Sequence, residues 1–214
     1  MRIALIISYY NAPHLLNLCL ASVSMQTRKP DQIILCADQM SLDWKSVQTG
    51  TRPTPDGEFT MELLREVFRL ATLPTAVVPI DIFIRQPHNG FGKERLFNKA
   101  ILETDCDYLV VLDQDCILPP DFIEIHERIA KRNQMICAMY TSLEKHENEL
   151  VTRESIIDGS VWNKIPRGYE GEPEIWCGTG SAVWKTDALR VNGFDTRFGW
   201  CGCDYNFSLR LRKL

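Results

Sequence analysis

The sequence predicts an α/β fold in which a mostly parallel central sheet has helices on both faces, giving three layers. Apolar runs such as 108–112 have no polar side, which is typical of strands buried by helices on both faces. Stretches with helical spacing of apolar residues alternate with these runs along the chain. The first strand, helix and second strand fit into about 35 residues, which is the length of a right-handed parallel crossover unit.

The composition is that of an ordinary soluble globular protein, and 214 residues fit a single domain, which we take to span 1–214. The net charge of −4 argues against a protein that binds nucleic acid or an anionic membrane surface. The apolar run at 3–7 is too short for a signal peptide, and no run approaches the roughly 18 residues that cross a bilayer. We therefore expect a cytoplasmic protein, with its eight irregularly spaced cysteines mostly reduced.

In chain order, the first predicted strand is 2–8 and the second is 32–37. The helix between them is marked by apolar residues at helical spacing: Leu15, Leu16, Leu18, Leu20 and Val23. The pattern then loosens, with a turn-rich loop at 51–57 and an amphipathic helix at 59–73 before a third strand at 80–84. No glycine-rich phosphate-binding fingerprint follows the first strand, which argues against a dinucleotide site.

The segment 85–95 contains two glycines and three cations, and it opens a helix predicted to end near Glu103. A helix amino terminus with Lys93 and Arg95 close by is a ready anion site. A solvated basic loop is the alternative, and the pattern does not decide between the two.

The fourth predicted strand, 108–112, runs directly into Asp113 and Asp115. The pair Pro119-Pro120 stops the strand, and 121–132 has helical spacing. In open parallel sheets ligands bind at this end of the strands. An Asp-x-Asp here puts both carboxylates on the same side of an extended backbone, where they suit Mn²⁺ or Mg²⁺ held together with substrate phosphates. A solvated turn that starts the next helix is the alternative.

The remaining elements are predicted with less regular patterns. A fifth strand is expected at 135–140, followed by a long polar loop or lid at 142–172. Small residues in 176–184 indicate a turn into a short strand, and 185–191 a helical turn. The last block places glycines and aromatics ahead of Asp204, whose carboxylate can cap the helix that follows.

Five motifs occur in order across nearly the whole chain. They are Ser8-Tyr9-Tyr10-Asn11, Ala37-Asp38-Gln39-Met40-Ser41, Lys93-Glu94-Arg95-Leu96-Phe97-Asn98-Lys99-Ala100, Asp113-Gln114-Asp115 and Gly199-Trp200-Cys201-Gly202-Cys203-Asp204. Together they resemble the family-2 glycosyltransferases of the GT-A fold, and the last motif is also similar to the C-terminal motif of galactosyltransferase-type domains. The resemblance implies a Rossmann-like nucleotide-binding half at 1–115 and an acceptor-binding half at 116–214.

The same resemblance implies a role for individual residues. A nucleotide-sugar donor would contact residues from the first three motifs: Ser8, Tyr10, Asn11, Asp38, Lys93 and Arg95. Asp113 would face the ribose or the donor sugar and act as the secondary metal ligand, and Asp115 would be the main ligand of Mn²⁺ or Mg²⁺. Asp204 would be the general base. Trp200 beside it would offer an apolar face to a sugar ring, with packing as the alternative role.

The resemblance thus implies a metal-dependent inverting glycosyltransferase that moves a sugar from a nucleoside-diphosphate sugar to a glycan, lipid-linked or other hydroxyl acceptor. A UDP-sugar is the donor expected first. Two features depart from the family: Cys203 replaces the first acid of a Glu-Asp pair, and the chain ends at Leu214, ten residues after Asp204, where relatives usually continue. Either the acceptor half is truncated or the site is completed by something else. Peripheral attachment to the inner face of the membrane through the missing region is an alternative location.

Two other functions stay open. A catalytically inactive sugar- or partner-binding module of the same fold is favoured by Cys203 and by the short acceptor half. A nucleotidyltransferase would also use paired acids and a metal, but it normally carries a glycine-rich, basic signature directly after its first strand, and 8–13 lacks one.

Overall fold

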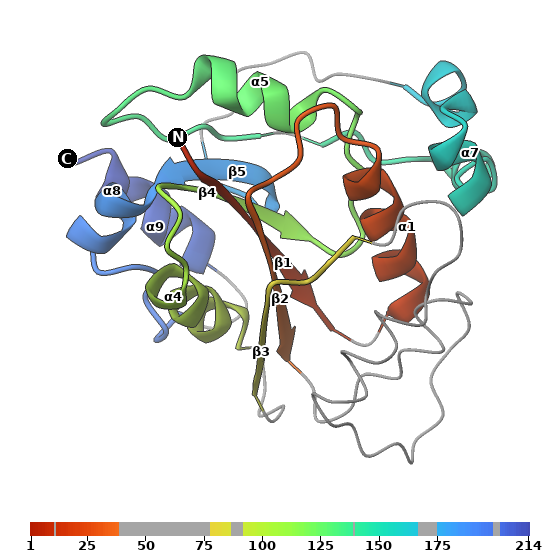
Figure 1. The fold of residues 1–214 in the computed structure, drawn as a ribbon. Helices are drawn as coiled ribbons and strands as arrows, with labels where there is room; N and C mark the ends of the chain where they lie inside the picture. Colours follow the sequence, from red (N-terminus) through yellow and green to blue (C-terminus); the bar gives the residue numbers. More distant parts are fainter. Residues whose placement is uncertain (11, 39–77, 87–91, 139, 167–174, 199–201) are drawn as a thin grey trace.

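The computed structural model describes residues 1–10, 12–38, 78–86, 92–138, 140–166, 175–198 and 202–214. A five-stranded sheet crosses the middle of the molecule, with helices on both faces (Figure 1). The α/β class and the three-layer arrangement predicted from the sequence are therefore confirmed.

Four strands of the sheet are parallel, and the fifth runs in the opposite direction. In the spatial order β3-β2-β1-β4-β5, they are β3 (Ile82–Gln86), β2 (Gln32–Asp38), β1 (Ile3–Tyr9), β4 (Tyr108–Asp113) and β5 (Thr179–Trp184). The four parallel strands begin within two residues of their predicted positions. Parallel neighbours bring their carboxyl ends to one edge of a sheet, so polar residues that end these strands lie side by side.

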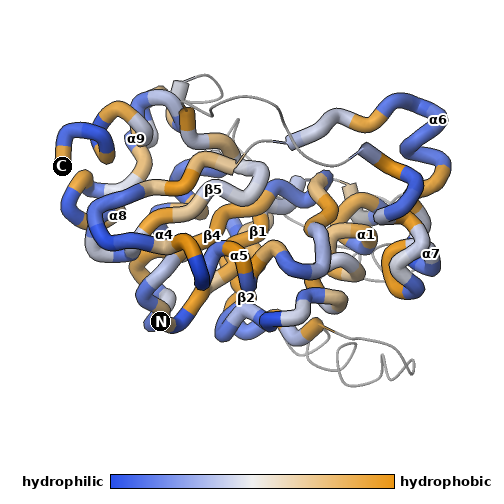
Figure 2. Tube along the Cα trace, turned by 90° about the horizontal axis from the view of Figure 1, so that it is seen from above, coloured by the Kyte–Doolittle hydropathy of each residue, from blue (hydrophilic) through white to orange (hydrophobic). Residues whose placement is uncertain are grey.

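Alternate residues of each strand pack into two separate cores. On one face, the odd-numbered residues of the central strand β1 pack against α1 (Pro13–Ser24) and α5 (Phe122–Ile129). On the other face, its even-numbered residues pack with α4 (Lys93–Glu103), α8 (Lys185–Arg190) and α9 (Cys203–Leu211). Figure 2 shows the hydrophobic strands enclosed between these helices. This burial on both faces is why the strands have no polar side.

The predicted fifth strand at 135–140 is wrong. In its described part, Ile136 forms one isolated bridge with Ala182 of β5, with a 2.8 Å hydrogen bond in each direction. Two residues later the backbone N–H of Ala138 donates to the Ser181 hydroxyl, which replaces the next backbone pairing. The place beside β4 is taken by β5.

The predicted loop at 142–172 contains three short helical segments in its described part: α6 (Lys145–Asn148), α7 (Arg153–Ile157) and the 3₁₀ turn η1 (Ser160–Asn163). α6 and α7 each begin with a reciprocal capping box, in α7 between Thr152 and Ser155. These segments are too short to show helical periodicity in the sequence, which explains the wrong prediction.

Some predictions concern residues outside the described part of the chain, namely the loop at 51–57 and the helix at 59–73. Among the residues that are described, no helix has the length and apolar character needed to span a bilayer. The seven cysteines in this part of the chain are free.

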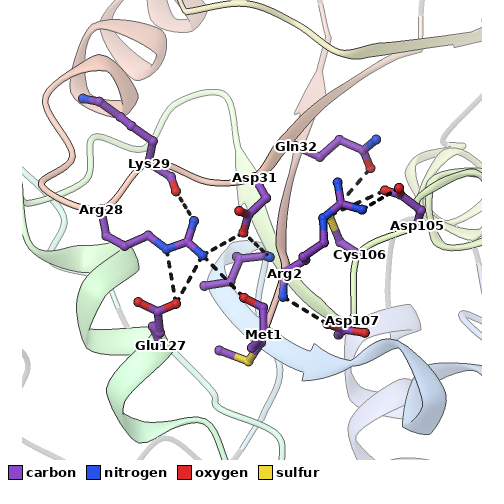
Figure 3. A network of polar contacts seen from close by, with 11 residues as sticks. Met1, Arg2, Arg28, Lys29, Asp31, Gln32, Asp105, Cys106, Asp107 and Glu127 are labelled. Carbon is purple, nitrogen blue, oxygen red and sulfur yellow. Dashed lines mark hydrogen bonds and ion pairs between the residues drawn. The ribbon is translucent and has the colours of Figure 1, made fainter.

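A polar network ties the amino ends of the strands to α5 (Figure 3). Arg28 pairs with Asp31 at 2.7 Å and with Glu127 of α5 at 3.2 Å. Asp31 also accepts a 2.7 Å hydrogen bond from the backbone N–H of Ile3, the first residue of β1. The network lies at the edge of the sheet opposite to the strand ends described below, so it stabilises the fold without touching that edge.

Replacing Asp31 by asparagine is expected to lower the free energy of unfolding by about 1 kcal/mol at pH 7. Burial alone would raise the pKa of Asp31, but the hydrogen bonds from Arg28 and from Ile3 outweigh burial and lower it. Because the folded-state pKa is lowered, this stabilisation is present above the ordinary aspartate pKa of about 3.9 and is lost as the pH falls through the folded-state value. Urea unfolding at several pH values measures the difference. Asp105→Asn, which removes the half-exposed pair with Arg2, is the control and should have little effect.

Candidate functional site

The candidate site lies where β1 and β4 end and α4 begins. Asp113 is the last residue of β4, and its register partner in β1 is Ser8. The Ser8 hydroxyl donates a 2.6 Å hydrogen bond to Asp113 Oδ1. The same oxygen forms an ion pair with the ammonium group of Lys93, the first residue of α4. The Lys93 side chain is 18% exposed and that of Asp113 is 28% exposed, so the pair is largely shielded from solvent.

Gly178 encloses the other side of this ion pair. Its carbonyl oxygen accepts a 2.5 Å hydrogen bond from the backbone N–H of Asp113. A Cβ atom at position 178 would collide with Asp113 Oδ2 and with Lys93 Nζ. A larger residue at this position would have to displace the Asp113 carboxylate or the Lys93 ammonium group. The sequence indicated a small-residue turn here but gave no sign of this contact.

Gly178→Ala is expected to separate Lys93 from Asp113 and to lower the free energy of unfolding by about 1–3 kcal/mol, because the added methyl group has no space. Urea unfolding measures the loss. Gly159→Asn is the control, since Gly159 has open space around it and a φ of +78° that asparagine tolerates. Equal stability of Gly178→Ala and the wild-type protein would show that the segment can move away from the pair without cost.

Asp204, in the first turn of α9, joins the same charged cluster. Burial raises the pKa of Asp204 and the Asp113 carboxylate raises it further, whereas the Lys93 ammonium opposes both effects. Burial lowers the pKa of Lys93, but Asp113 and Asp204 outweigh burial and raise it. Three charges from β4, α4 and α9 thus act on one another. Asp204 does not cap α9 with its side chain; the N-cap residue is Gly202.

The two acids of the Asp-x-Asp motif differ in environment. The strand ends at Asp113, and a turn closed by a 3.1 Å hydrogen bond from Cys116 N–H to the Asp113 carbonyl follows. The extended backbone on which the sequence argument depended is therefore absent. Asp115 is exposed, and its carboxylate lies 3.9 Å from the Cys116 thiol. The Gln114 side-chain amide makes two 2.7 Å hydrogen bonds to the backbone of Tyr10 and so joins the ends of β1 and β4.

The donor set in this region fits a divalent ion that a substrate helps to bind. Among the described residues, no group of three or more His, Cys, Asp or Glu side chains could hold an ion by itself. Asp113 and Asp115 provide hard oxygen ligands, and Mg²⁺ commonly uses one or two carboxylates together with substrate phosphates. The carboxylate of Asp115 faces solvent and is available for such an ion.

Asp38 lies at the end of β2, along the same edge of the sheet. Its side chain is buried, with 7% exposed. Gln86 of β3 donates a 3.1 Å hydrogen bond to Asp38 Oδ1 and a 3.0 Å hydrogen bond to the carbonyl of Gly92. Strands β2 and β3 are thereby linked to the start of α4. This arrangement brings Asp38 to the same end of the sheet as Asp113 and Lys93, as the resemblance implies.

Of the other predicted site residues, the structure describes Tyr10 and Arg95. Tyr10 follows β1 and is 51% exposed. Arg95 is exposed on α4, and in the described part of the chain its side chain makes no hydrogen bond or ion pair. Lys93 is therefore the cation that α4 brings to the acidic cluster. Asn11 and Trp200 lie outside the described residues.

Sequence reasoning gave no individual role to two residues of α4. Asn98 Oδ1 accepts a 2.7 Å hydrogen bond from the Phe194 N–H, and Asn98 Nδ2 donates a 2.8 Å hydrogen bond to the Phe194 carbonyl. This clamp holds the segment between α8 and α9 against α4. Glu94 is buried with 1% exposed, and among the described residues neither of its carboxyl oxygens has a hydrogen-bond partner. For Asn98, the one available sequence signal was a polar residue at a helical position that faces the core. For Glu94 the sequence offered no such signal.

Cys203, at the position where the resemblance implies an acid, cannot replace a carboxylate. Its side chain is buried, and burial together with the neighbouring Asp204 raises the pKa of the Cys203 thiol to about 11. The thiol is therefore neutral at physiological pH. It lies 3.8 Å from Asp204 Oδ1 and can act only as a weak hydrogen-bond donor to it.

Solved structures with this fold were found, although no curated protein sequence matches the chain. The mannosyltransferase PcManGT from Pyrobaculum calidifontis, in complex with GDP-Man and Mn²⁺, is 18% identical with a TM-score of 0.58, over 98% of this chain and 50% of that one. S. aureus TarS 1-349 in complex with UDP is 12% identical with a TM-score of 0.59, over 99% and 55% of the two chains. The chain thus spans about half the length of these proteins, and at this identity the likeness shows the fold alone.

The sequence also matches a family model. A family model described as glycosyl transferase family 2 matches residues 79–198, which is more than half of the chain and includes Lys93, Asp113 and Asp115. The matched region covers β3, α4, β4 and β5, the elements that surround the ion pair. The chain belongs to glycosyl transferase family 2.

Proposed function

We propose that the protein is a metal-dependent inverting glycosyltransferase that moves a sugar from a nucleoside-diphosphate sugar to a hydroxyl acceptor. The observation that carries this proposal is the cluster of Asp113, Lys93 and Asp204 at the carboxyl ends of the parallel strands. The cluster provides the Lys93 cation and the Asp113 carboxylate, which is two residues before the exposed acid Asp115. It also provides the Asp204 carboxylate, whose pKa is raised. Family membership favours sugar transfer over the alternative of nucleotidyl transfer.

In the proposed reaction, the acceptor hydroxyl attacks the anomeric carbon while the bond from that carbon to the diphosphate oxygen breaks. The electron pair of the broken bond stays on the diphosphate, and the proton of the hydroxyl passes to the Asp204 carboxylate. Lys93 offers positive charge to the diphosphate from the start of α4, where the helix amino terminus also favours anions. A divalent ion at Asp115 would neutralise negative charge on the leaving group.

The nucleoside end of the donor is proposed to lie along the edge from β1 to β3. Asp38 there carries hydrogen-bond acceptors for a nucleobase, and Ser8 and Tyr10 lie beside it at the end of β1. The two neighbouring structures contain GDP-Man and UDP, and a third, also of TarS 1-349, contains UDP-GlcNAc. We expect a UDP-sugar first and a GDP-sugar second. The acceptor is proposed to be a glycan, a lipid-linked molecule or another hydroxyl compound.

Calorimetric titration of UDP, GDP and dTDP, each with and without Mn²⁺, tests the donor site. We expect one nucleoside diphosphate to bind at least about tenfold more tightly with Mn²⁺ present, because the diphosphate oxygens and the protein carboxylates would bind the same metal ion. Asp115→Ala should remove this dependence, and Glu103→Ala on the exposed end of α4 should leave it unchanged. If none of the three nucleotides binds in a metal-dependent way, the proposal is wrong.

A second candidate is a binding module of the same fold without catalytic activity. The neutral, buried Cys203 thiol next to Asp204 favours this candidate, since it cannot share a proton or a charge as a carboxylate would. Only the glycosyltransferase would catalyse sugar transfer and release the nucleoside diphosphate. Binding of a nucleotide-sugar without release of the nucleoside diphosphate, in the presence of a range of hydroxyl acceptors, would support the binding module.

A further inference from the structure

Lys93 occupies a position that is unfavourable for a cation. It is the first residue of the 11-residue helix α4, where the unpaired N–H groups form the positive end of the helix dipole. Its ammonium group is nevertheless mostly buried there, with 18% of the side chain exposed. The ion pair with Asp113 and the nearby charge of Asp204 outweigh this cost. The carboxylates of β4 and α9 thus hold Lys93 as a counter-ion.

The contacts of Asp113 leave little room for another ligand. Oδ1 already accepts the hydrogen bond from Ser8 and the ion pair from Lys93. Oδ2 faces Gly178 so closely that even a Cβ atom does not fit between them. Asp115, by contrast, is exposed to solvent. A divalent ion can therefore reach Asp115 directly, but it can reach Asp113 Oδ1 only if the Lys93 ammonium moves away.

We propose that Lys93 is a tethered counter-ion that competes with a divalent ion for Asp113. In the donor-free protein Lys93 neutralises Asp113 and leaves Asp115 as the one open acid of the motif. When a diphosphate arrives, it offers the flexible lysine another anion, and Asp113 becomes available to the metal. This inference rests on the proposed donor and metal site. It makes Lys93 a positioning residue that couples binding of the metal to binding of the diphosphate.

The coupling has a thermodynamic consequence that can be measured without turnover. If Lys93 suppresses binding of free Mn²⁺, removing its charge should increase the Mn²⁺ affinity of the nucleotide-free protein. We expect Lys93→Met to bind Mn²⁺ at least about fivefold more tightly than the wild-type protein, within the usual range of coupling between two ligands. The gain should require Asp113, so the double variant Lys93→Met/Asp113→Asn should return to the wild-type affinity or below.

Titration of the nucleotide-free proteins with Mn²⁺ alone, followed by calorimetry or by water-proton relaxation, provides the test. Lys99→Met is the matched control, because Lys99 is an exposed lysine of the same helix and its loss changes the net charge equally. It should alter Mn²⁺ affinity less than about twofold, because exposed charges are screened within about 10 Å. If Lys93→Met unfolds, Lys93→Gln, which keeps a polar side chain without the charge, takes its place.

Three results would overturn the inference: an unchanged Mn²⁺ affinity in both Lys93 variants, an equal gain in Lys99→Met, or a gain that persists in the double variant with Asp113→Asn. The last two would assign the gain to long-range charge instead of competition for Asp113. Failure of the proposed function looks different. It would appear as absence of metal-dependent nucleotide binding by the wild-type protein, which is measured separately from the Mn²⁺ affinity of Lys93→Met.

Discussion

Asp204→Asn is expected to lower the rate of sugar transfer by about 10²- to 10⁴-fold, while the affinity for the nucleoside diphosphate changes little. Asparagine keeps the shape of the side chain but cannot take up a proton from the acceptor hydroxyl. Asp204 lies in the first turn of α9, and no nucleotide contact is assigned to it. Release of nucleoside diphosphate from the donor measures the rate, and calorimetry measures the affinity.

The pH dependence of transfer tests the same role. Burial and the Asp113 carboxylate raise the pKa of Asp204, with Lys93 acting in the opposite direction. A general base must be unprotonated, so kcat/KM should fall as the pH drops through this raised pKa, above the ordinary aspartate value of about 3.9. Lys93→Met removes the opposing charge and should move this acidic limb to higher pH. The residual activity of Asp204→Asn should show no such limb.

Asp121→Asn is the matched control for Asp204→Asn. Asp121 is an exposed aspartate that precedes α5, and its side chain makes no capping hydrogen bond there. Its replacement should leave both the rate and the nucleotide affinity unchanged. A fully active Asp204→Asn variant would remove Asp204 from the role of base, and a loss of nucleotide affinity equal to the loss of rate would assign it to donor binding.

The layers of the fold were predictable because runs of apolar residues in the sequence mark the strands that are buried on both faces. β1 and β4 have no polar residue in their central parts, and only a sheet covered on both faces buries such runs. The position of Asp113 followed from the same pattern, since it is the first charged residue after the buried run of β4. The parallel arrangement then brought Asp113 beside Ser8 without further information.

Pairings that depend on tertiary contacts were not predictable in this way. The run 135–140 is as apolar as a strand, but in its described part it pairs with β5 at Ile136 alone, because the Ala138 N–H donates to the Ser181 hydroxyl in place of a backbone partner. The contact of Lys93 with Asp113 depends on Gly178, which is distant from both in the sequence. Local patterns carry no information about which segment passes over a strand end, and Lys93 and Arg95 looked equally suited to the site from the sequence alone.

The residues around α4 show how one helix can serve several parts of the site. Lys93 pairs with β4, and Asn98, further along α4, clamps the Phe194 backbone ahead of α9. Phe194 in turn stacks on Phe207 of α9, the helix that carries Asp204, with ring centroids 4.1 Å apart. Changes in α4 should therefore affect the donor side and the acceptor side together, which is the reason to measure binding and rate separately in each variant.

Glu94→Gln is expected to raise the free energy of unfolding at pH 7 by about 1–3 kcal/mol. Glu94 is 1% exposed, and within the described part of the chain neither carboxyl oxygen has a hydrogen-bond partner. Burial raises the pKa of Glu94, and Asp38 adds to the effect. Because the folded-state pKa is raised, wild-type stability is greatest below the ordinary glutamate pKa of about 4.3 and falls as the pH rises through the folded-state value. Glutamine has no charge to bury, so this loss should be absent in the variant.

Urea unfolding of both proteins between pH 4 and pH 8 separates this effect from other causes. The advantage of Glu94→Gln should be small at the acidic end, where the buried carboxyl is neutral, and should grow toward pH 8. Glu103→Gln, at the exposed end of the same helix, is the matched control and should show no pH-dependent change. A variant less stable than the wild-type protein at pH 8 would mean that the Glu94 carboxylate is stabilised where it lies. In that case the unpaired acid beside Lys93 would be a further anionic group of the site instead of a cost to the fold.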